Sequence, residues 1–334
     1  MKKCIVVLML VGLMASSAFA TNSWVGPSGS WGNGALWGSG LPDGSTLQGD
    51  LKICKTNVTS CDLDVAAVSM DNGKLALGGA AGYTIAFNIK TGGSIAIGTE
   101  FKVGDSSVGG QGMYGKVVQT GGTVTLNTGT KVGKLEIGYK AGGDGIYTIS
   151  GGTINGTGTI SVGANATSSG GASGAFGKFT VQGSSGSIST TGNLLVGTSD
   201  ATETYTGTGK LEFKLESGTV SAINAGNVYI DPTATAPSIA DLIVSITSGT
   251  PTGNILLVNN TGTAAVYGVF DGVSVDGGAT YGSAIEGASV VLGGNTYTLT
   301  YKGGTGNDIV LVIPEPATIA LLSIGLLAIR RNRK

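Results

Sequence analysis

The chain has 334 residues, with 19 lysines and arginines, 20 acidic residues and no histidine. The absence of histidine removes the commonest general base and the commonest metal ligand from the chain. Its 61 glycines show no period of three, which excludes collagen, and a hydrophobic fraction of 41% does not fit a disordered chain. The composition therefore predicts an all-β protein of many short strands joined by glycine turns.

The first twenty residues have the form of a cleavable secretory signal. A basic start is followed by a hydrophobic segment over residues 5–14, and Ala18-Phe19-Ala20 is a small-x-small cleavage pattern. We therefore expect a signal peptide over residues 1–20, cleavage after Ala20 and export through the Sec machinery. Loss of both predicted ends leaves 13 basic and 19 acidic residues, a charge of about −6 with no arginine, which argues against nucleic-acid binding.

Residues 21–82 are predicted to form a tryptophan-rich cap and the first strands. Trp24, Trp31 and Trp37 lie close together near the mature N-terminus, and the chain has no other tryptophan. The surrounding glycine-rich pattern resembles the opening of exported bacterial repeat proteins. Such residues can seal the first turn of a solenoid, whose core would otherwise recruit other chains. A sugar-stacking platform is the alternative.

Two cysteines, Cys54 and Cys61, remain in the predicted mature chain. In an oxidising compartment they are expected to form one disulfide, which would stabilise the fold by roughly 2.5 kcal/mol for so short a loop. A zinc site is disfavoured, since the mature chain supplies neither a histidine nor a third cysteine.

Residues 83–230 repeat a unit of three short strands. The turn glycines are spaced by 29, 30, 34 and 32 residues, and they are Gly93, Gly122, Gly152, Gly186 and Gly218. This period predicts stacked supersecondary units, and we expect a right-handed parallel β-helix, or solenoid, with glycines at its corners. A β-sandwich and a propeller are the competing folds. The predicted inward residues are Val124, Leu126, Ile149, Ile154, Ile160, Val162, Val181, Ile188 and Val196.

Residues 231–313 interrupt the repeat and are predicted to form a small β cap. A Leu-Val-Asn-Asn strand, a Gly-x-Phe-x-Gly turn and a closing strand over residues 301–311 follow one another. This order resembles the closing module of autotransporter-associated β-strand repeat proteins, which implies a solenoid that ends in a β module.

One segment of this region suggests a metal site. Residues 303–311, Gly-Gly-Thr-Gly-Asn-Asp-Ile-Val-Leu, match a single calcium-binding nonapeptide of the RTX repeat, with Asp308 as its weak candidate ligand. Calcium needs six to eight oxygens from several tandem copies, so we expect a tight hairpin turn and no metal or other cofactor.

The acidic residues of the mature chain form no compact catalytic motif. Several lie near predicted loops, namely Glu100, Asp105, Glu136, Asp144, Asp200 and Glu203. Glu212 and Glu216 alternate with Lys210 and Lys214, which predicts an exposed, charge-paired strand face. Stacking of turns can still bring acids from separate rungs together, but we expect no enzyme activity.

The last 21 residues, 314–334, combine three features in order. Pro314-Glu315-Pro316 precedes thirteen uncharged residues, 317–329, and a terminal basic cluster. This order resembles the PEP-CTERM sorting signal, in which an exosortase recognises and removes the tail. The resemblance implies a hydrophobic sorting helix and a transient inner-membrane tether. A permanent tail anchor and a buried helix are the alternatives.

Together these features predict an exported, non-enzymatic structural or adhesive protein of the cell surface or extracellular matrix. Its expected partners are the Sec machinery and exosortase during export, and exopolysaccharide in a biofilm afterwards. A polysaccharide-degrading β-helix enzyme and a carbohydrate-binding module are the alternative functions.

Overall fold

The computed structural model covers all 334 residues and describes most of the predicted mature chain. The described residues are 22–23, 28–33, 35, 51–53, 60–65, 68–71, 73–78, 84–105, 113–129, 131–139, 142–163, 174–197, 207–231, 239–277 and 281–314. The predicted signal peptide, the sorting helix, Trp24, Trp37 and Cys54 lie outside these residues.

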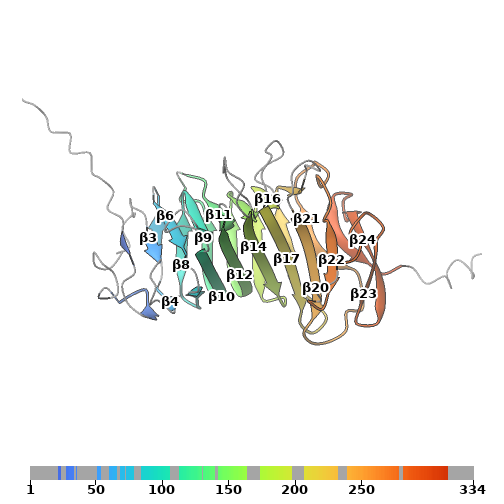
Figure 1. Cartoon of the computed structure of the whole chain (residues 1–334), viewed down its shortest axis with the longest axis horizontal. Helices are drawn as coiled ribbons and strands as arrows, with labels where there is room; N and C mark the ends of the chain where they lie inside the picture. Colours follow the sequence, from blue (N-terminus) through green and yellow to red (C-terminus); the bar gives the residue numbers. More distant parts are fainter. Residues whose placement is uncertain are drawn as a thin grey trace, which may run out of the picture.

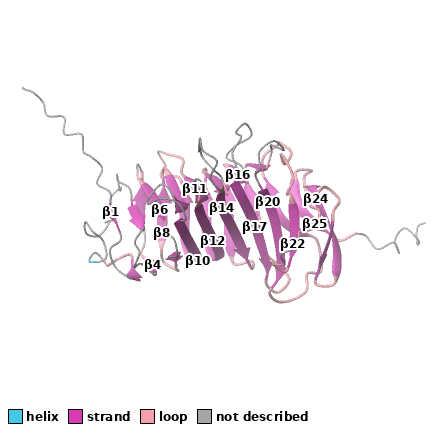
Figure 2. Ribbon diagram, viewed as in Figure 1, coloured by secondary structure: helices cyan, strands magenta, loops and turns pink. Residues whose placement is uncertain are grey.

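The described chain is a β-solenoid of about 6 turns and contains no α-helix. Figure 1 shows an elongated rod in which the strands lie side by side from the N-terminal end, in blue, to the C-terminal end, in red. Strands make up nearly all of its regular structure (Figure 2). A typical turn contributes one strand to each of three faces, so the predicted three-strand unit is confirmed. The predicted right-handed winding stays a prediction.

Face 1 is a parallel sheet of eight strands. In spatial order they are β1 (Asn22–Ser23), β3 (Leu51–Ile53), β6 (Lys74–Leu77), β9 (Glu100–Asp105), β11 (Lys134–Tyr139), β13 (Thr159–Val162), β16 (Asn193–Val196) and β19 (Asn227–Ile230).

Faces 2 and 3 share two long strands, β10 (Met113–Leu126) and β12 (Gly143–Gly156), whose first halves lie on face 2 and second halves on face 3. The other strands of face 2 are β2 (Ser28–Ser30), β4 (Ser60–Leu63), β7 (Thr84–Ile89), β14 (Ala175–Gln182), β17 (Gly207–Leu215), β20 (Ile239–Ile246) and β22 (Gly272–Val275). Those of face 3 are β5 (Val68–Met70), β8 (Ser94–Ile97), β15 (Gly186–Thr190), β18 (Ile223–Ala225) and β21 (Ile255–Asn260).

Alternation along each strand directs apolar side chains into one continuous core. All nine predicted inward residues are completely buried, and so are Leu211, Phe213 and Leu215. A row of aromatic rings runs along the core with centroid separations of 5.6–6.2 Å, through Trp31, Phe87, Phe101, Tyr147 and Phe179. The hydroxyl of Tyr147 donates to Gln119 Oε1 over 2.7 Å, which satisfies one buried polar group with another.

Glycines line the corner where face 1 meets face 2. Gly104, Gly138, Gly163 and Gly197 end strands of face 1, and Gly115, Gly145, Gly177 and Gly209 lie on face 2. A Cβ atom on Gly145 would lie 2.1 Å from the carbonyl oxygen of Val103 and 2.3 Å from the nitrogen of Gly138. Because these contacts are with backbone, a side chain here cannot be accommodated by rotation of a neighbour. We call these eight residues the glycine seam.

Four of the five predicted turn glycines are required at the corner between faces 2 and 3, for two different reasons, whereas Gly186 has neither a positive φ nor a close backbone contact. Gly122, Gly152 and Gly218 have φ angles of 66°, 82° and 72°, as expected for a turn that favours glycine. Gly93 has no such angle, and a Cβ there would lie 2.2 Å from the carbonyl oxygen of Leu63. At that corner close backbone approach requires the glycine.

The solenoid is longer than the predicted segment 83–230. At the N-terminal side, β3 to β6 already pair in parallel with the strands that follow. At the C-terminal side β20 and β21 continue faces 2 and 3 in parallel, and β22 pairs with β20. Parallel stacking therefore continues beyond residue 231, although the Gly-Gly turn is absent there.

An antiparallel cap closes the C-terminal end of the rod. β25 (Asp308–Val312) pairs antiparallel with β21, followed in the sheet by β24 (Asn295–Gly303) and β23 (Ser289–Leu292). β25 covers the edge of β21 that would otherwise be open to pairing with another chain. These three strands lie within the segment 231–313 that is predicted to form a small β cap.

Within the described residues, no helix is long and apolar enough to cross a membrane. The expected transmembrane character of the tail concerns residues 317–329, which lie outside the described part.

Candidate functional site

The three faces of the rod differ in charge. Face 1 and face 2 carry ion pairs, whereas none of the strand residues described on face 3 is charged. Apart from Leu256 of β21, the outward strand residues described on face 3 form two rows, in which Ser94, Thr123, Thr153 and Ser187 make row I. Row II consists of Ser69, Ala96, Thr125, Asn155, Ser189, Asn224 and Asn259. Face 3 thus presents hydroxyl and amide groups on successive rungs.

Amide groups connect the last rungs of row II. Asn259 Nδ2 donates to Asn224 Oδ1 over 2.7 Å, and Asn224 Nδ2 donates to the carbonyl oxygen of Ile188 over 3.0 Å. These hydrogen bonds orient the side-chain amides of Asn224 and Asn259 along the direction in which the rungs stack. They leave the Asn259 side chain half-buried at the end of the row.

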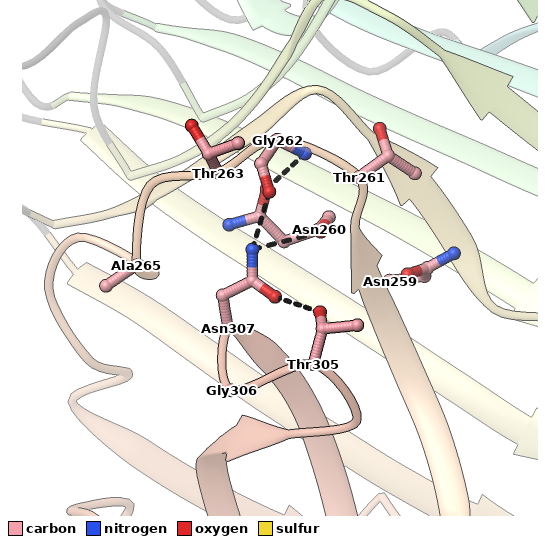
Figure 3. A pocket seen from close by; sticks show the side chains of 9 residues that line it. All are labelled: Asn259, Asn260, Thr261, Gly262, Thr263, Ala265, Thr305, Gly306 and Asn307. Carbon is pink, nitrogen blue, oxygen red and sulfur yellow. Dashed lines mark hydrogen bonds between the residues drawn. The ribbon is translucent and has the colours of Figure 1, made fainter.

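A hollow of about 570 Å³ lies where row II meets the cap (Figure 3). Its lining contains no charged residue and consists of Asn259, Asn260, Thr261, Gly262, Thr263, Ala265, Thr305, Gly306 and Asn307. Two loops build it: one follows β21, and the other is the turn between β24 and β25. Sequence reasoning missed this hollow because its two loops are more than forty residues apart.

The turn that resembles the RTX nonapeptide joins these two loops. Asn307 Nδ2 donates to the carbonyl oxygens of Gly262, over 2.7 Å, and of Asn260, over 3.2 Å. Asp308 Oδ1 accepts the backbone N–H of Asn260 over 2.9 Å. The segment forms the predicted hairpin turn, with positive φ at Gly304 and Gly306. Asp308, the weak metal candidate, is thus buried and bonded to backbone.

A buried charge cluster lies on face 1. Glu100 Oε2 is 2.9 Å from Nζ of both Lys74 and Lys102, and Lys102 Nζ lies 3.6 Å from the centre of the Tyr139 ring. Glu136, in the neighbouring rung, is 3.8 Å from the same Lys102 nitrogen. Stacking therefore brings together two carboxylates that are 36 positions apart in the chain.

The two carboxylates of this cluster differ in proton affinity. Burial raises the pKa of Glu136 to about 7, and Lys102 offsets only part of that effect. Among the described residues, Glu136 Oε2 finds no hydrogen-bond partner. Desolvation also acts on Glu100, but its bonds to Lys74 and Lys102 leave its pKa below the usual value. Within the described ranges, no group of three or more acidic or cysteine residues could hold a metal ion.

Face 2 carries further ion pairs. Glu212 accepts from Lys178 Nζ and from Thr180 Oγ1, over 2.9 and 2.8 Å, and Lys210 pairs with Asp241 over 3.0 Å. The predicted charge pairing is present, but its geometry differs from the expectation. Glu212 is 5% exposed rather than solvated, because neighbouring rungs cover its side chain.

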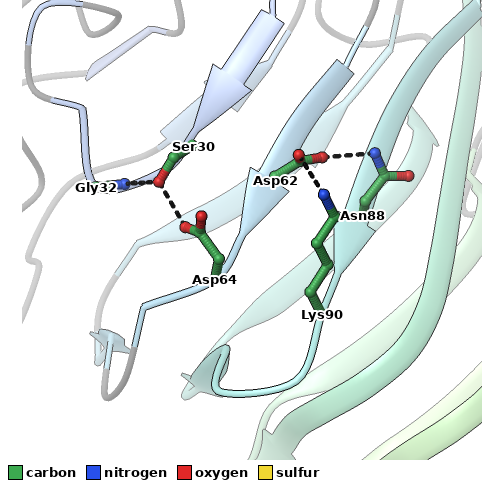
Figure 4. Close-up of polar contacts among 6 residues, drawn as sticks. All are labelled: Ser30, Gly32, Asp62, Asp64, Asn88 and Lys90. Carbon is green, nitrogen blue, oxygen red and sulfur yellow. Dashed lines mark hydrogen bonds and ion pairs between the residues drawn. The ribbon is translucent and has the colours of Figure 1, made fainter.

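A smaller polar network joins the first rungs of face 2 (Figure 4). Asp62 accepts from Lys90 Nζ over 2.6 Å and from Asn88 Nδ2 over 2.7 Å, while Ser30 Oγ donates to Asp64 over 2.6 Å. The bonds to Lys90 and Asn88 outweigh desolvation and lower the pKa of Asp62. This network links three consecutive strands, β2, β4 and β7.

The remaining predicted site residues fall partly outside the described chain. Cys61 is completely buried, and in its thiol form burial, Asp62 and Asp64 would raise its pKa. Its predicted partner Cys54 is not among the described residues, so the disulfide stays a prediction. Ala20, Glu315 and Pro316 also lie outside them. Pro314 is exposed and directly follows Ile313, whose N–H donates to Asn254 Oδ1 over 3.0 Å.

The fold and the end of the chain define an exported β-solenoid protein. Residues 312–334 match the PEP-CTERM protein-sorting motif, so the match begins where β25 ends. This motif implies that the chain is exported and sorted by an exosortase to the cell envelope or surface. No curated protein and no solved structure was found to match the chain. The resemblance to autotransporter-associated β-strand repeats stays a prediction.

Proposed function

We propose that the protein is a non-enzymatic structural or adhesive component of the cell surface or biofilm matrix, associated with exopolysaccharide. The observation that carries this proposal is a β-solenoid whose C-terminal end is covered by an antiparallel cap and leads directly into the sorting motif at residue 312. A rod of stacked turns offers long flat faces, which suit contact with an extended polymer better than with a small substrate. The predicted autotransporter-associated repeats agree with such a role.

Delivery of the protein to the surface would depend on the signals at the two ends of the chain. The Sec machinery would export the protein and remove residues 1–20, after which the hydrophobic tail would hold it transiently in the inner membrane. Exosortase would then recognise Pro314-Glu315-Pro316 and release the mature rod to the surface.

Fractionation of the producing cells tests this route together with the role. The full chain is expected in the matrix fraction, and a variant with Pro314, Glu315 and Pro316 all changed to Ala in the inner-membrane fraction. Deletion of the gene should weaken matrix cohesion several-fold without a change in the length of the polysaccharide. Unchanged cohesion would contradict the structural role, and a matrix location of the tail variant would contradict the sorting step.

One observation supports polysaccharide hydrolysis as a second candidate. Glycosidases use two carboxylates whose environments push their pKa values apart, and Glu136 and Glu100 differ in this direction. Incubation of the purified protein with extracted matrix polymer separates the two functions. Shortening of the polymer that Glu136→Gln and Glu100→Gln each abolish would replace the structural proposal by this one.

The carbohydrate-binding alternative receives no support from Trp31. This residue is completely buried, packs against Phe87 and donates its backbone N–H to Asp62. It therefore cannot stack on a sugar in this structure, and the capping role stays a prediction.

A further inference from the structure

Face 3 differs from the other two faces of the rod in the chemistry of its outward side chains. The outward positions of rows I and II are Ser, Thr, Asn and Ala over seven rungs, from β5 to β21. The other two faces place six lysines in ion pairs, namely Lys74, Lys90, Lys102, Lys178, Lys210 and Lys214. Among the strand residues that the structure describes, charge is thus confined to faces 1 and 2.

The spacing of rows I and II is regular. Parallel strands repeat at about 4.8 Å across the rungs, and alternate residues of one strand lie about 6.6 Å apart. The outward side chains therefore form a two-dimensional array of donors and acceptors without a charged neighbour in the described strands. Each hydroxyl or amide can exchange a bound water for a hydroxyl of a ligand at little net cost.

The hollow beside the cap continues this array. Asn259 belongs both to row II and to the lining of the hollow, and Thr261, Thr263 and Thr305 add further hydroxyl groups. Figure 3 shows Asn259 and Thr263 on opposite sides of the hollow. The amide of Asn307 bonds the two loops together, and the amide of Asn260 donates to Ala264 within its own loop, so both side chains shape the hollow. The array therefore ends in a concave, uncharged site.

We propose that face 3 is the docking surface for an uncharged polysaccharide chain, which lies across the rungs and reaches the hollow at the C-terminal end. This inference rests on the proposed association with extracellular polymer, and it specifies the surface and the class of polymer. The predicted mature chain carries a charge of about −6, which disfavours an acidic polymer. Many weak and nearly equal contacts imply that affinity rises with the length of the polymer.

Affinity electrophoresis of the purified protein through gels containing a soluble neutral glucan tests the proposal, with a polyuronate gel for comparison. The wild type should be retarded by the glucan and not by the polyuronate. Glucose oligomers should compete more strongly as their length increases. The double variant Thr153→Arg/Asn155→Arg, in the middle of face 3, should reduce binding at least tenfold. Thr148 lies on face 2 of the same strand, β12. The control variant Thr148→Arg should therefore bind the glucan like the wild type.

Ser187→Arg/Ser189→Arg provides an independent variant at two exposed positions, in case the first pair disturbs folding. Tryptophan fluorescence and circular dichroism confirm that each variant is folded. Retardation by the polyuronate alone, no retardation in either gel, or equal binding by both face 3 variants and the wild type would each overturn the proposal. If the wild type nevertheless stays with extracted matrix, the proposed function stands and this assignment of face and polymer fails.

Discussion

In the body of the solenoid, neighbouring turns meet through backbone atoms along the glycine seam, whereas the contacts near each end involve side chains that occur once. The seam repeats the same contact at Gly104, Gly138, Gly163 and Gly197. Trp31 packs against Phe87 near the N-terminal end, and Asn307 bonds the cap to the C-terminal end. The body therefore depends on the absence of side chains at one corner, while the ends depend on particular side chains. Substitutions in the glycine seam and substitutions at the ends therefore test these two requirements separately.

The largest effect is expected in the seam. Gly145→Ala would place a methyl group 2.1 Å from the Val103 carbonyl oxygen, and both atoms belong to rigid paired strands. We expect a loss of more than about 3 kcal/mol in unfolding free energy, because neither strand can move without breaking its ladder. Urea unfolding followed by circular dichroism measures the change.

Gly253 supplies the matched control for that substitution. It lies outside the seam, and a methyl group there would meet no atom within 4 Å in the described part of the chain. Gly253→Ala should change the unfolding free energy by less than about 0.5 kcal/mol. Equal effects of the two substitutions would show that the seam is not a steric constraint.

The next largest effect is expected at the N-terminal end. Trp31→Ala removes a completely buried ring that packs against Phe87, which should cost about 3–5 kcal/mol. Because repeats unfold partly from their ends, the loss should concentrate in β2 and β4 rather than in β14 or β17. Amide hydrogen exchange resolves this difference. Trp31→Phe keeps an aromatic ring and should lose less protection, and uniform loss along the rod would contradict a local capping role.

The repeated body of the solenoid could be predicted from the sequence because each turn repeats the same pattern of residues. The Gly-Gly turns, the alternation in β17 and the glycines that end strands of face 1 recur at a nearly constant period. Adding that period to a residue number would also have found row II, since Asn155, Ser189, Asn224 and Asn259 are separated by 34, 35 and 35 positions. The position of Glu136 opposite Lys102, which lies 34 residues earlier, follows from the same arithmetic.

The ends and the hollow could not be predicted in this way because their contacts do not repeat. Nothing in the local pattern shows that Asn307 bonds to the loop after β21, or that Trp31 turns inward while its neighbours in sequence are polar. Burial of Glu212 is another example, since strand alternation places it outward but neighbouring rungs cover it. Such features depend on chain segments that meet in only one place.

A smaller, pH-dependent effect is expected at Glu136. Its pKa of about 7 lies above the ordinary value of 4.5, so the folded chain binds this proton more tightly than the unfolded chain. Its stabilising contribution is complete below about pH 4.5 and is lost as the pH rises through about 7. Glu136→Gln should therefore match the wild type at pH 4 and be more stable by about 3 kcal/mol at pH 8.

Urea unfolding across this pH range checks the Glu136 prediction, and Glu212 provides the contrast. The bonds from Lys178 and Thr180 hold the pKa of Glu212 below its usual value, so its contribution is present at neutral pH and lost in acid. Glu212→Gln should therefore destabilise the protein at pH 8. If Glu136→Gln and Glu212→Gln changed the unfolding free energy with the same pH dependence, the surroundings of the two carboxylates on faces 1 and 2 would not shift their pKa values in opposite directions.

The smallest effect is expected at the C-terminal end, where Asn307→Ala removes donors to the carbonyl oxygens of Gly262 and Asn260. Asn307 is 7% exposed, so the buried carbonyl groups would lose their partner at a cost of about 2 kcal/mol. The loss should appear as faster amide exchange in β24 and β25. Thr263→Ala, at an exposed position of the same hollow, should leave that exchange unchanged. Since Asn307 here joins two loops through backbone carbonyls, added calcium should restore no protection, and restoration by calcium would instead identify the turn as an RTX-type metal site.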